Sequence, residues 1–260
     1  MSRILVIARR EWLEQLRQPF MVGVIGSLFA IIAILSVLVL VLLDTLAGDI
    51  DGTVNLMRWL PGGEADPEGT LASLTAGTVG VANFLVFSQL LGMVAVLAGH
   101  SVLHDHQSHT LPFLLLAPVR RAELLLGKVL GAMGTPPVLY LVVCGLLVVM
   151  ATSLSVTDPV ADRLPPSPAW LVAFFLGGPI WAACVASVCA IVSTLASDVR
   201  TAQQVVWFVM FFATLLCGYM LATALPEGVL VQLGVAGVGA AATAGTIALG
   251  SQVISRDLTR

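Results

Sequence analysis

The sequence predicts an all-α integral membrane protein with six transmembrane helices, an N-terminal amphipathic helix at the membrane interface, and a cytoplasmic helix between the second and third spans. Three observations lead to this prediction. Hydrophobic residues make up 58% of the 260 residues and charged residues only 10%, whereas about a quarter of an ordinary soluble domain is charged. Apolar runs long enough to cross a bilayer recur along the chain. The basic residues gather in alternate connections between these runs.

The first segment, residues 1–19, has the periodicity of an amphipathic helix that is too polar to span a membrane. Its apolar face repeats at steps of three and four residues: Leu5, Ala8, Trp12 and Leu16, with Leu13 beside them. Its opposite face carries most of the charges: Arg3, Arg10, Glu14 and Arg17, with Arg9 as the exception. Such a helix lies in the interface plane, with its tryptophan and leucines towards the lipid and its arginines towards the headgroups. The alternative is a soluble helix packed on a partner.

Six apolar segments follow this helix, and we predict a membrane span for each: 20–43, 79–103, 123–150, 169–196, 205–225 and 229–250. Residues 44–78 form an outer loop, and residues 104–122 form a cytoplasmic loop. Two spans contain helix-breaking residues, which predict bends: Gly131, Gly134 and Pro136-Pro137 in the third span, and Gly177-Gly178-Pro179 in the fourth. The sixth span is rich in small residues that favour close helix packing, among them Gly234, Gly237, Gly239 and Gly245.

The orientation follows from the distribution of positive charge. Six spans place both termini on the same side of the membrane. Of the 12 basic residues, only Arg58 and Arg163 fall in the predicted outer segments. Because short cytoplasmic connections carry the excess of arginine and lysine, the sequence predicts cytoplasmic termini in a multi-pass protein of the plasma (cell inner) membrane.

The loop at 104–122 is longer than a turn between two helices requires. Thr110 is suited to cap a short helix, because Pro112 is tolerated in a first turn and Pro118 would end it. The residues between the two prolines are apolar, and a cytoplasmic helix of this kind is costly to expose unless it packs on a partner or lies in the interface. The loop therefore predicts a docking helix.

Two charged residues stand where the third span begins. Glu123 falls in the first turn, where a carboxylate suits the positive end of a helix. Lys128 lies about one turn deeper, and we expect its amine to reach back to the headgroups.

The predicted membrane interior carries no internal source of energy. No charged residue lies near the middle of any span, which argues against a proton-coupled carrier. The sequence also lacks a GxxxxGK[ST] phosphate loop, so transport work would need energy from another polypeptide. Four polar residues are candidates to line a pathway, although interhelical hydrogen bonding is their commoner role: Asn83, Gln89, Tyr140 and Tyr219.

The whole chain resembles the type-2 ABC transporter permease family. The resemblance is carried by an RREWLEQLRQP segment before the first span and by TL…LLLAPVRRAELLLGK after the second. Asp105 and His106 stand at the family's acidic-basic pair, whereas His109 replaces its glycine and Pro112 its glutamate. The docking residues that the resemblance implies are Thr110, Leu111, Pro112, Phe113, Leu114, Leu115, Leu116, Ala117, Pro118, Arg120 and Arg121.

The resemblance also implies partners and a direction. It implies a permease that pairs with a second copy or a similar chain, an N-terminal elbow helix that includes Arg9, Arg10, Trp12 and Arg17, and a cytoplasmic coupling helix that docks on an ATP-binding-cassette ATPase. ATP and Mg²⁺ would be bound by that ATPase, with no cofactor in this chain and no nucleic acid. Members of the family usually export their cargo, and the sequence does not choose a cargo.

Histidines gather before the docking stretch, at positions His100, His104, His106 and His109. The pair His100/His104 has the i,i+4 spacing of two ligands on one helical face, and imidazole suits zinc or copper. The alternative is a set of polar residues at the boundary between helix and water, and we favour it because no cysteine lies nearby.

Two other functions fit a polytopic membrane protein. A membrane scaffold would recruit an ATPase without moving a solute. An intramembrane enzyme would need a nucleophile–base pair or a metal cluster within the spans, and the sequence offers neither.

Overall fold

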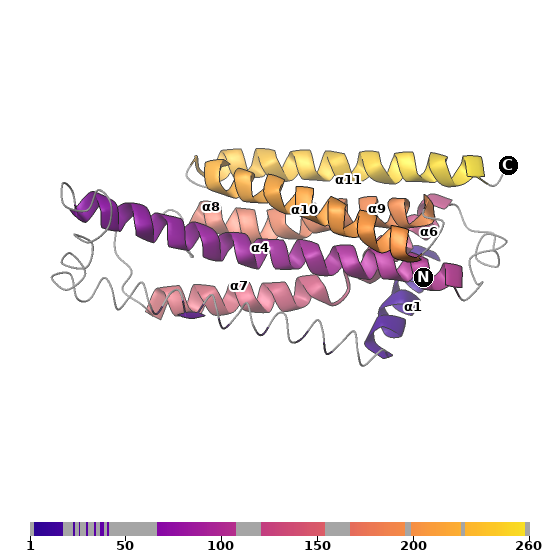
Figure 1. The fold of residues 1–260 in the computed structure, drawn as a ribbon, viewed down its shortest axis with the longest axis horizontal. Coiled ribbons are helices and arrows are strands. Elements are labelled where there is room, and N and C mark those ends of the chain that lie inside the picture. Colours follow the sequence, from indigo (N-terminus) through magenta and orange to yellow (C-terminus); the bar gives the residue numbers. More distant parts are fainter. Residues whose placement is uncertain are drawn as a thin grey trace.

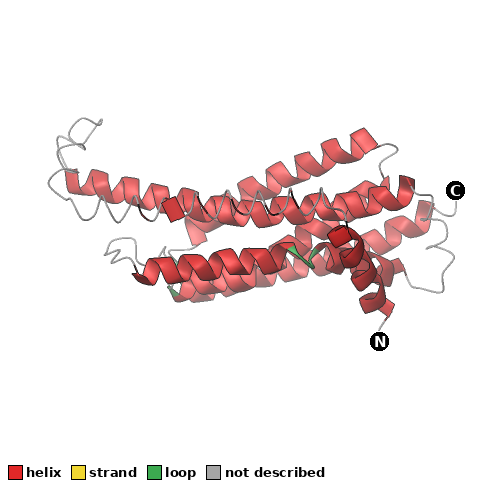
Figure 2. Cartoon of the chain, turned by 90° about the horizontal axis from the view of Figure 1, so that it is seen from below, coloured by secondary structure: helices red, strands yellow, loops and turns green. Residues whose placement is uncertain are grey.

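The computed structural model describes residues 3–17, 67–107, 121–153, 167–195, 199–224 and 227–257, together with isolated helical positions between 23 and 41. These residues form helices and short connections, and no strand occurs among them. Figure 1 shows the long helices side by side along one axis, with a short helix crossing their end. The view in Figure 2, turned by 90°, shows the same helical arrangement. The predicted all-α class is therefore confirmed for the described part of the chain.

The bundle is built around α4 (Pro67–Gln107) and α9 (Gly178–Leu195), which pack against each other. α10 (Val199–Ala224) covers α4, and α11 (Val229–Asp257) covers α9 (Figure 1). Of the apolar stretch of α4, 61% is buried inside the bundle, whereas only 17% of the apolar stretch of α11 is buried. The second and fourth predicted spans therefore supply the centre of the bundle, and the last helix lies at its edge.

α4 extends beyond the predicted second span at both ends, since it begins at Pro67 and ends at Gln107. The end of the predicted outer loop and the start of the predicted cytoplasmic loop are thus helical. Their remaining residues, 44–66 and 108–120, lie outside the described part of the chain.

The predicted bend in the third span is present as a complete interruption. α6 (Arg121–Ala132) ends before Met133–Thr135, and α7 (Pro136–Ser153) begins with two prolines. Proline lacks an amide hydrogen and is tolerated in a first helical turn, so the Pro-Pro pair starts a new helix instead of continuing the old one. The connection remains tight, because the Gly134 amide donates to the Gly131 carbonyl at 3.1 Å.

The fourth span bends in a different way. The hydroxyl of Ser167 accepts a hydrogen bond from the Trp170 amide at 3.3 Å and caps α8 (Pro168–Leu171). A π-helix, η2 (Val172–Gly177), connects α8 directly to α9. The wider turn precedes Pro179, whose missing amide hydrogen disturbs regular α-helical bonding. The predicted break at Gly177-Gly178-Pro179 is therefore a change of helix type and not an interruption.

Four helical stretches of the described chain are long and apolar enough to cross a membrane: Gly80–Ser101, Ala122–Val149, Pro168–Thr194 and Val229–Gln252. They match the second, third, fourth and sixth predicted spans. Most of the first predicted span lies outside the described residues. For the fifth, α10 is helical as expected, with a shorter apolar stretch at Gln204–Leu216. The six-span arrangement stays a prediction.

The short transverse helix is α1 (Arg3–Arg17), which packs on α6 (Figure 1). It lies at the same end of the bundle as the C-terminal end of α11. Both termini of the described chain are therefore at one end of the bundle.

Candidate functional site

Three polar side chains from three helices meet at the end of the bundle near α1. Glu11 comes from α1, Ser101 from α4 and Lys128 from α6. The Lys128 Nζ donates to Glu11 Oε1 at 3.0 Å and to Ser101 Oγ at 3.1 Å. The Ser101 hydroxyl in turn donates to Glu11 Oε2 at 2.6 Å. We call Glu11, Ser101 and Lys128 the polar junction.

The polar junction is buried. Glu11 is 5% exposed and Lys128 is 3% exposed. Two charges removed from water are stable only when they are paired and their remaining donors and acceptors are bonded. Both carboxylate oxygens of Glu11 accept a hydrogen bond, and the Lys128 amine also lies 3.4 Å from the Ser101 carbonyl oxygen. The junction therefore meets the conditions for a buried ion pair.

The position of Lys128 corrects a prediction. The sequence predicted that its amine would reach back to the headgroups, and instead the amine is buried against Glu11. The reason is that α1 covers this part of α6, so the nearest anion is a carboxylate of the same chain. The prediction for Glu123 is confirmed, since it occupies the first turn of α6.

Three glycines, two on α6 and one just after it, allow α1 to approach so closely. A methyl group placed on Gly127 would lie 2.6 Å from Ile7 Cγ2, and one on Gly131 would lie 2.5 Å from Glu11 Cβ. The same methyl group on Gly134 would lie 2.6 Å from Trp12 Cδ1. No real side chain fits at such distances, so the Gly127, Gly131 and Gly134 row is the seat on which α1 rests. Close approach through small residues is typical of membrane helices.

The close approach at Gly134 also brings Trp12 within hydrogen-bonding distance of the α6–α7 interruption. The Trp12 indole Nε1 donates to the Thr135 hydroxyl at 2.9 Å. α1 is thus fixed at the polar junction and again at the point where the third span bends.

The outer side of α1 presents its remaining predicted residues. Leu5, Trp12 and Leu16 are exposed by 52%, 42% and 43%, which is the arrangement expected of a side that faces lipid. Arg9, Arg10 and Arg17 are exposed as well, and Arg10 forms an ion pair of 3.3 Å with Glu14. The packed face is formed by Ile4, Ile7, Ala8 and Glu11, together with part of the Trp12 ring. Only Ala8 and Trp12 of this set belong to the predicted apolar face.

The four candidate pathway residues occupy different surroundings. Asn83 is buried, and its Oδ1 accepts a hydrogen bond from the Trp170 Nε1 at 3.0 Å, so it joins α4 to α8. Tyr140 is fully buried beside Phe174 in the aromatic core. Gln89 is partly buried, and Tyr219 is exposed. The structure does not bring the four together, and a pathway along them stays a prediction.

The histidines and the docking residues can be placed only in part. His100, His104 and His106 lie on α4, and His100 is exposed. His109 and the docking residues from Thr110 to Arg120 lie outside the described part of the chain, while Arg121 begins α6. Within the described ranges, no group of three residues is placed to hold a metal ion.

The comparison with known families decides the class of this protein. A family model described as ABC-2 family transporter protein matches residues 5–234. The chain belongs to the ABC-2 family. A search of curated proteins returned no significant match.

Membership of the ABC-2 family confirms the resemblance found in the sequence. It implies a permease subunit of an ABC transporter, a membrane setting and an ABC ATPase partner. The match begins inside α1 and includes the predicted docking stretch, so the polar junction lies within the region that defines the family.

Sequence reasoning missed Glu11 and Ser101 as functional candidates, although a signal for Glu11 was present. Glu11 follows Ile7 by four residues and Ala8 by three, so it shares a helical face with apolar residues. A lone acid on an apolar face, together with a lysine inside a span, indicates a buried ion pair. Ser101 gave no such signal.

Proposed function

We propose that this chain is the permease subunit of an ABC exporter, active as a dimer with a second copy or a similar chain, and driven by a separate ATPase docked at the coupling helix between the second and third spans. The match to the ABC-2 family model over residues 5–234 supports the permease function most directly, and the coupling part of the proposal is supported by the polar junction. It joins the two helices that flank the docking stretch, α4 before it and α6 after it.

The polar junction ties together the helices on either side of the coupling helix, so a movement of the coupling helix is passed on to them. Ser101 lies about two helical turns before the end of α4, and Lys128 lies about two turns after the start of α6. Because Lys128 bonds to both Ser101 and Glu11, a movement of the docking stretch acts on α4, α6 and α1 together. α6 also packs on α9 and α11, so the same movement reaches the rest of the bundle.

The energy for transport is proposed to come from ATP hydrolysis on the partner chain. Without a phosphate-binding loop in this chain, ATP and Mg²⁺ belong to the partner ATPase. Export is the direction usual in the family, and the cargo classes found there include lipids and lipid-linked glycans, drugs, peptides, haem, sodium and a sulfur species for metalloenzyme maturation. The ATPase partner and the genes beside it are the observation that would best narrow this range.

The docking proposal is tested by a charge in the apolar stretch. Leu115→Asp should abolish co-purification of the ATPase while membrane insertion is retained, because it places a carboxylate in the expected contact. Leu115→Ile is the matched control and should keep the complex. Unchanged complex formation and ATPase stimulation with Leu115→Asp would overturn the docking proposal.

The orientation is tested separately. A reporter that is active only outside the cell should work when fused near Gly62 and fail when fused near Gln107. The reverse pattern would place both termini outside and contradict the proposed topology.

Transport itself distinguishes a permease from a membrane scaffold. In proteoliposomes that contain the chain and its ATPase, a permease moves cargo in an ATP-dependent way. A scaffold forms the same complex and gives no transport.

A further inference from the structure

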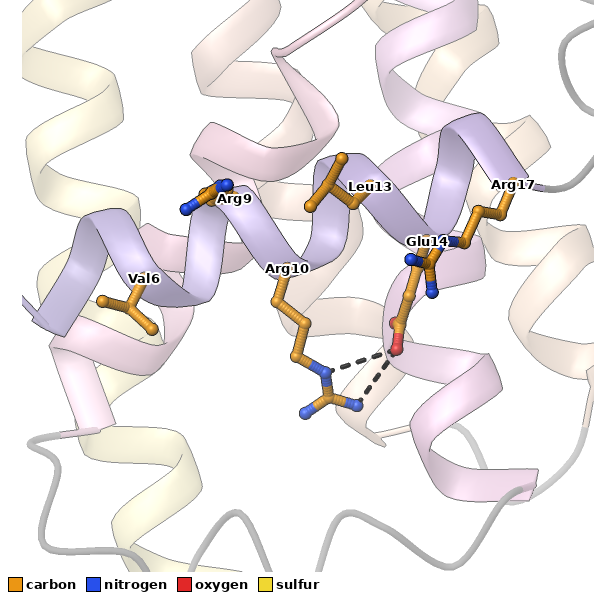
Figure 3. Close-up of a pocket in the computed structure, with 6 residues that line it drawn as sticks. All are labelled: Val6, Arg9, Arg10, Leu13, Glu14 and Arg17. Carbon is orange, nitrogen blue, oxygen red and sulfur yellow. Dashed lines mark hydrogen bonds and ion pairs between the residues drawn. The ribbon is translucent and has the colours of Figure 1, made fainter.

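The outer side of α1 carries a hollow of about 320 Å³ lined by Val6, Arg9, Arg10, Leu13, Glu14 and Arg17. Figure 3 shows two rows of side chains along the helix. Arg9, Leu13 and Arg17 form one row, and Val6, Arg10 and Glu14 form the other. Residues four apart are neighbours on a helix, so each row is continuous, and the hollow lies along them.

The charges in this hollow are unbalanced. It contains three guanidinium groups and one carboxylate, which is that of Glu14. This carboxylate is already engaged, because Arg10 donates to it through Nε and Nη2, both at 3.3 Å. Among the residues that the structure describes, neither Arg9 nor Arg17 has an ion-pair partner. Positive charge therefore remains at Arg9 and Arg17, and it is complementary to an anion.

The apolar residues decide what kind of anion fits. Leu13 lines the hollow between Arg9 and Arg17, and Val6 lies at its end beside Arg10 (Figure 3). Val6 and Leu13 are exposed by 54% and 40%. A small hydrophilic anion would leave these side chains uncovered. A phospholipid presents a phosphate for the guanidinium groups together with glycerol and acyl carbons for the apolar residues.

The position of the hollow on α1 also favours a membrane ligand. The row of Arg9, Leu13 and Arg17 borders the exposed apolar side, since Leu5 precedes Arg9 by four residues and Leu16 follows Leu13 by three. On an interfacial helix, the border between the apolar and the charged side lies at the level of the headgroups.

We propose that this hollow is a binding site for an anionic phospholipid, with Arg9 and Arg17 donating to its phosphate and Val6 and Leu13 contacting the carbons next to it. The site shares no residue with the polar junction, because Glu11 does not line the hollow. Guanidinium groups suit this ligand, since they bind phosphate oxygens in a bidentate manner.

The test uses the full-length chain in a mild neutral detergent and measures its equilibrium binding of fluorescent phosphatidylglycerol. A basic residue near an anionic surface contributes about a fivefold gain in affinity, so Arg9→Gln/Arg17→Gln should weaken binding by roughly 25-fold at low salt. Binding should also fall as salt is raised. Arg58→Gln/Arg163→Gln removes the same charge from segments outside α1 and should leave the affinity unchanged.

A second variant keeps the test decisive if the first folds poorly. Glu14→Gln removes the only carboxylate among the described residues that line the hollow and frees Arg10, so it should strengthen phosphatidylglycerol binding several-fold. Fluorescent phosphatidylcholine should bind weakly to all variants, because its headgroup carries no net charge.

Three results would overturn the proposal. Equal phosphatidylglycerol affinity in Arg9→Gln/Arg17→Gln and in the charge-matched control would show that Arg9 and Arg17 do not bind the lipid. Competition by inorganic phosphate as strong as that by phosphatidylglycerol would indicate a site for free anions. Loss of the ATPase from Arg9→Gln/Arg17→Gln with unchanged lipid preference would make this face a protein-docking surface.

Discussion

α1 carries two ion pairs of nearly equal length that differ in their surroundings. The Glu11–Lys128 pair spans 3.0 Å with side chains 6% and 3% exposed, whereas the Arg10–Glu14 pair spans 3.3 Å with side chains 45% and 37% exposed. The first joins α1 to α6, and the second joins two positions of α1 itself. One helix thus presents a buried and an exposed version of the same interaction.

The difference in burial indicates which of the two ion pairs fixes the position of α1 in the bundle. Water and salt screen the exposed pair, and such pairs contribute about 0.3–0.5 kcal/mol. The buried pair contributes no large net stability compared with apolar residues, but the loss of one partner leaves a buried charge, which costs about 3–5 kcal/mol. The buried pair therefore specifies how α1 sits on α6, and the exposed pair adds little to this.

The largest effect is expected from Glu11→Ala. This change leaves the Lys128 amine buried without its carboxylate, so the free energy of unfolding should fall by about 3–5 kcal/mol. Thermal or denaturant unfolding of the purified chain in mild detergent measures this value. Glu14→Ala on the same helix is the matched control and should cost no more than about 0.5 kcal/mol. Equal losses in the two variants would erase the distinction between the pairs.

The next effect concerns the seat that makes the buried pair possible. Gly131→Val places its Cβ 2.5 Å from Glu11 Cβ and 3.3 Å from the Ala8 carbonyl oxygen, and overpacking of this kind costs about 1–3 kcal/mol. The same unfolding assay measures the cost. Gly145→Val is the control, because no described atom lies within 4 Å of a methyl group at Gly145. If both valines have the same effect, α1 does not depend on the glycine row.

A buried and an exposed hydrogen bond between neutral groups should differ in the same way as the two ion pairs, with smaller energies. Asn83→Ala removes the acceptor of the buried Trp170 indole, and unfolding should become easier by about 1 kcal/mol. Thr135→Ala removes the acceptor of the exposed Trp12 indole, which water can replace, so its effect should be smaller. A larger loss for Thr135→Ala would show that burial does not govern the polar contacts of this bundle.

The smallest effect belongs to the exposed pair itself. Arg10→Ala should lower the free energy of unfolding by about 0.3–0.5 kcal/mol, and high salt should reduce this difference further. Unfolding curves at two salt concentrations measure both values. A loss above about 1 kcal/mol that persists in high salt would assign Arg10 a structural contact beyond its pair with Glu14.

The apolar helices and their interruptions could be predicted where local physics determines them. Hydrophobic length predicted six spans, and four of them match apolar helical stretches of the described chain. Pro136-Pro137 predicted the α6–α7 interruption, and the RREWLEQLRQP and LLLAPVRRAELLLGK segments indicated the family. These signals act within one segment of sequence, so no knowledge of neighbouring helices was needed.

The contacts between helices could not be predicted in the same way. Gly131 and Gly134 were interpreted as helix breakers, and the structure shows that they also seat α1. Conversely, a methyl group placed on Gly239 of α11 would lie 3.1 Å from Trp181 Cε2, whereas methyl groups at Gly234 and Gly237 would meet no described atom within 4 Å. A glycine permits close approach, but only the three-dimensional arrangement decides which helix approaches.

The central claim, that a buried ion pair fixes α1 on the third span, is tested most directly by a double-mutant cycle on Glu11 and Lys128. Free energies of unfolding are measured for Glu11→Ala, Lys128→Met and the double variant, with Arg10→Ala, Glu14→Ala and their combination as the reference cycle. We predict an interaction energy of about 2–3 kcal/mol for the buried pair and less than about 0.5 kcal/mol for the exposed pair. An interaction energy for Glu11 and Lys128 no larger than that of Arg10 and Glu14 would contradict the account.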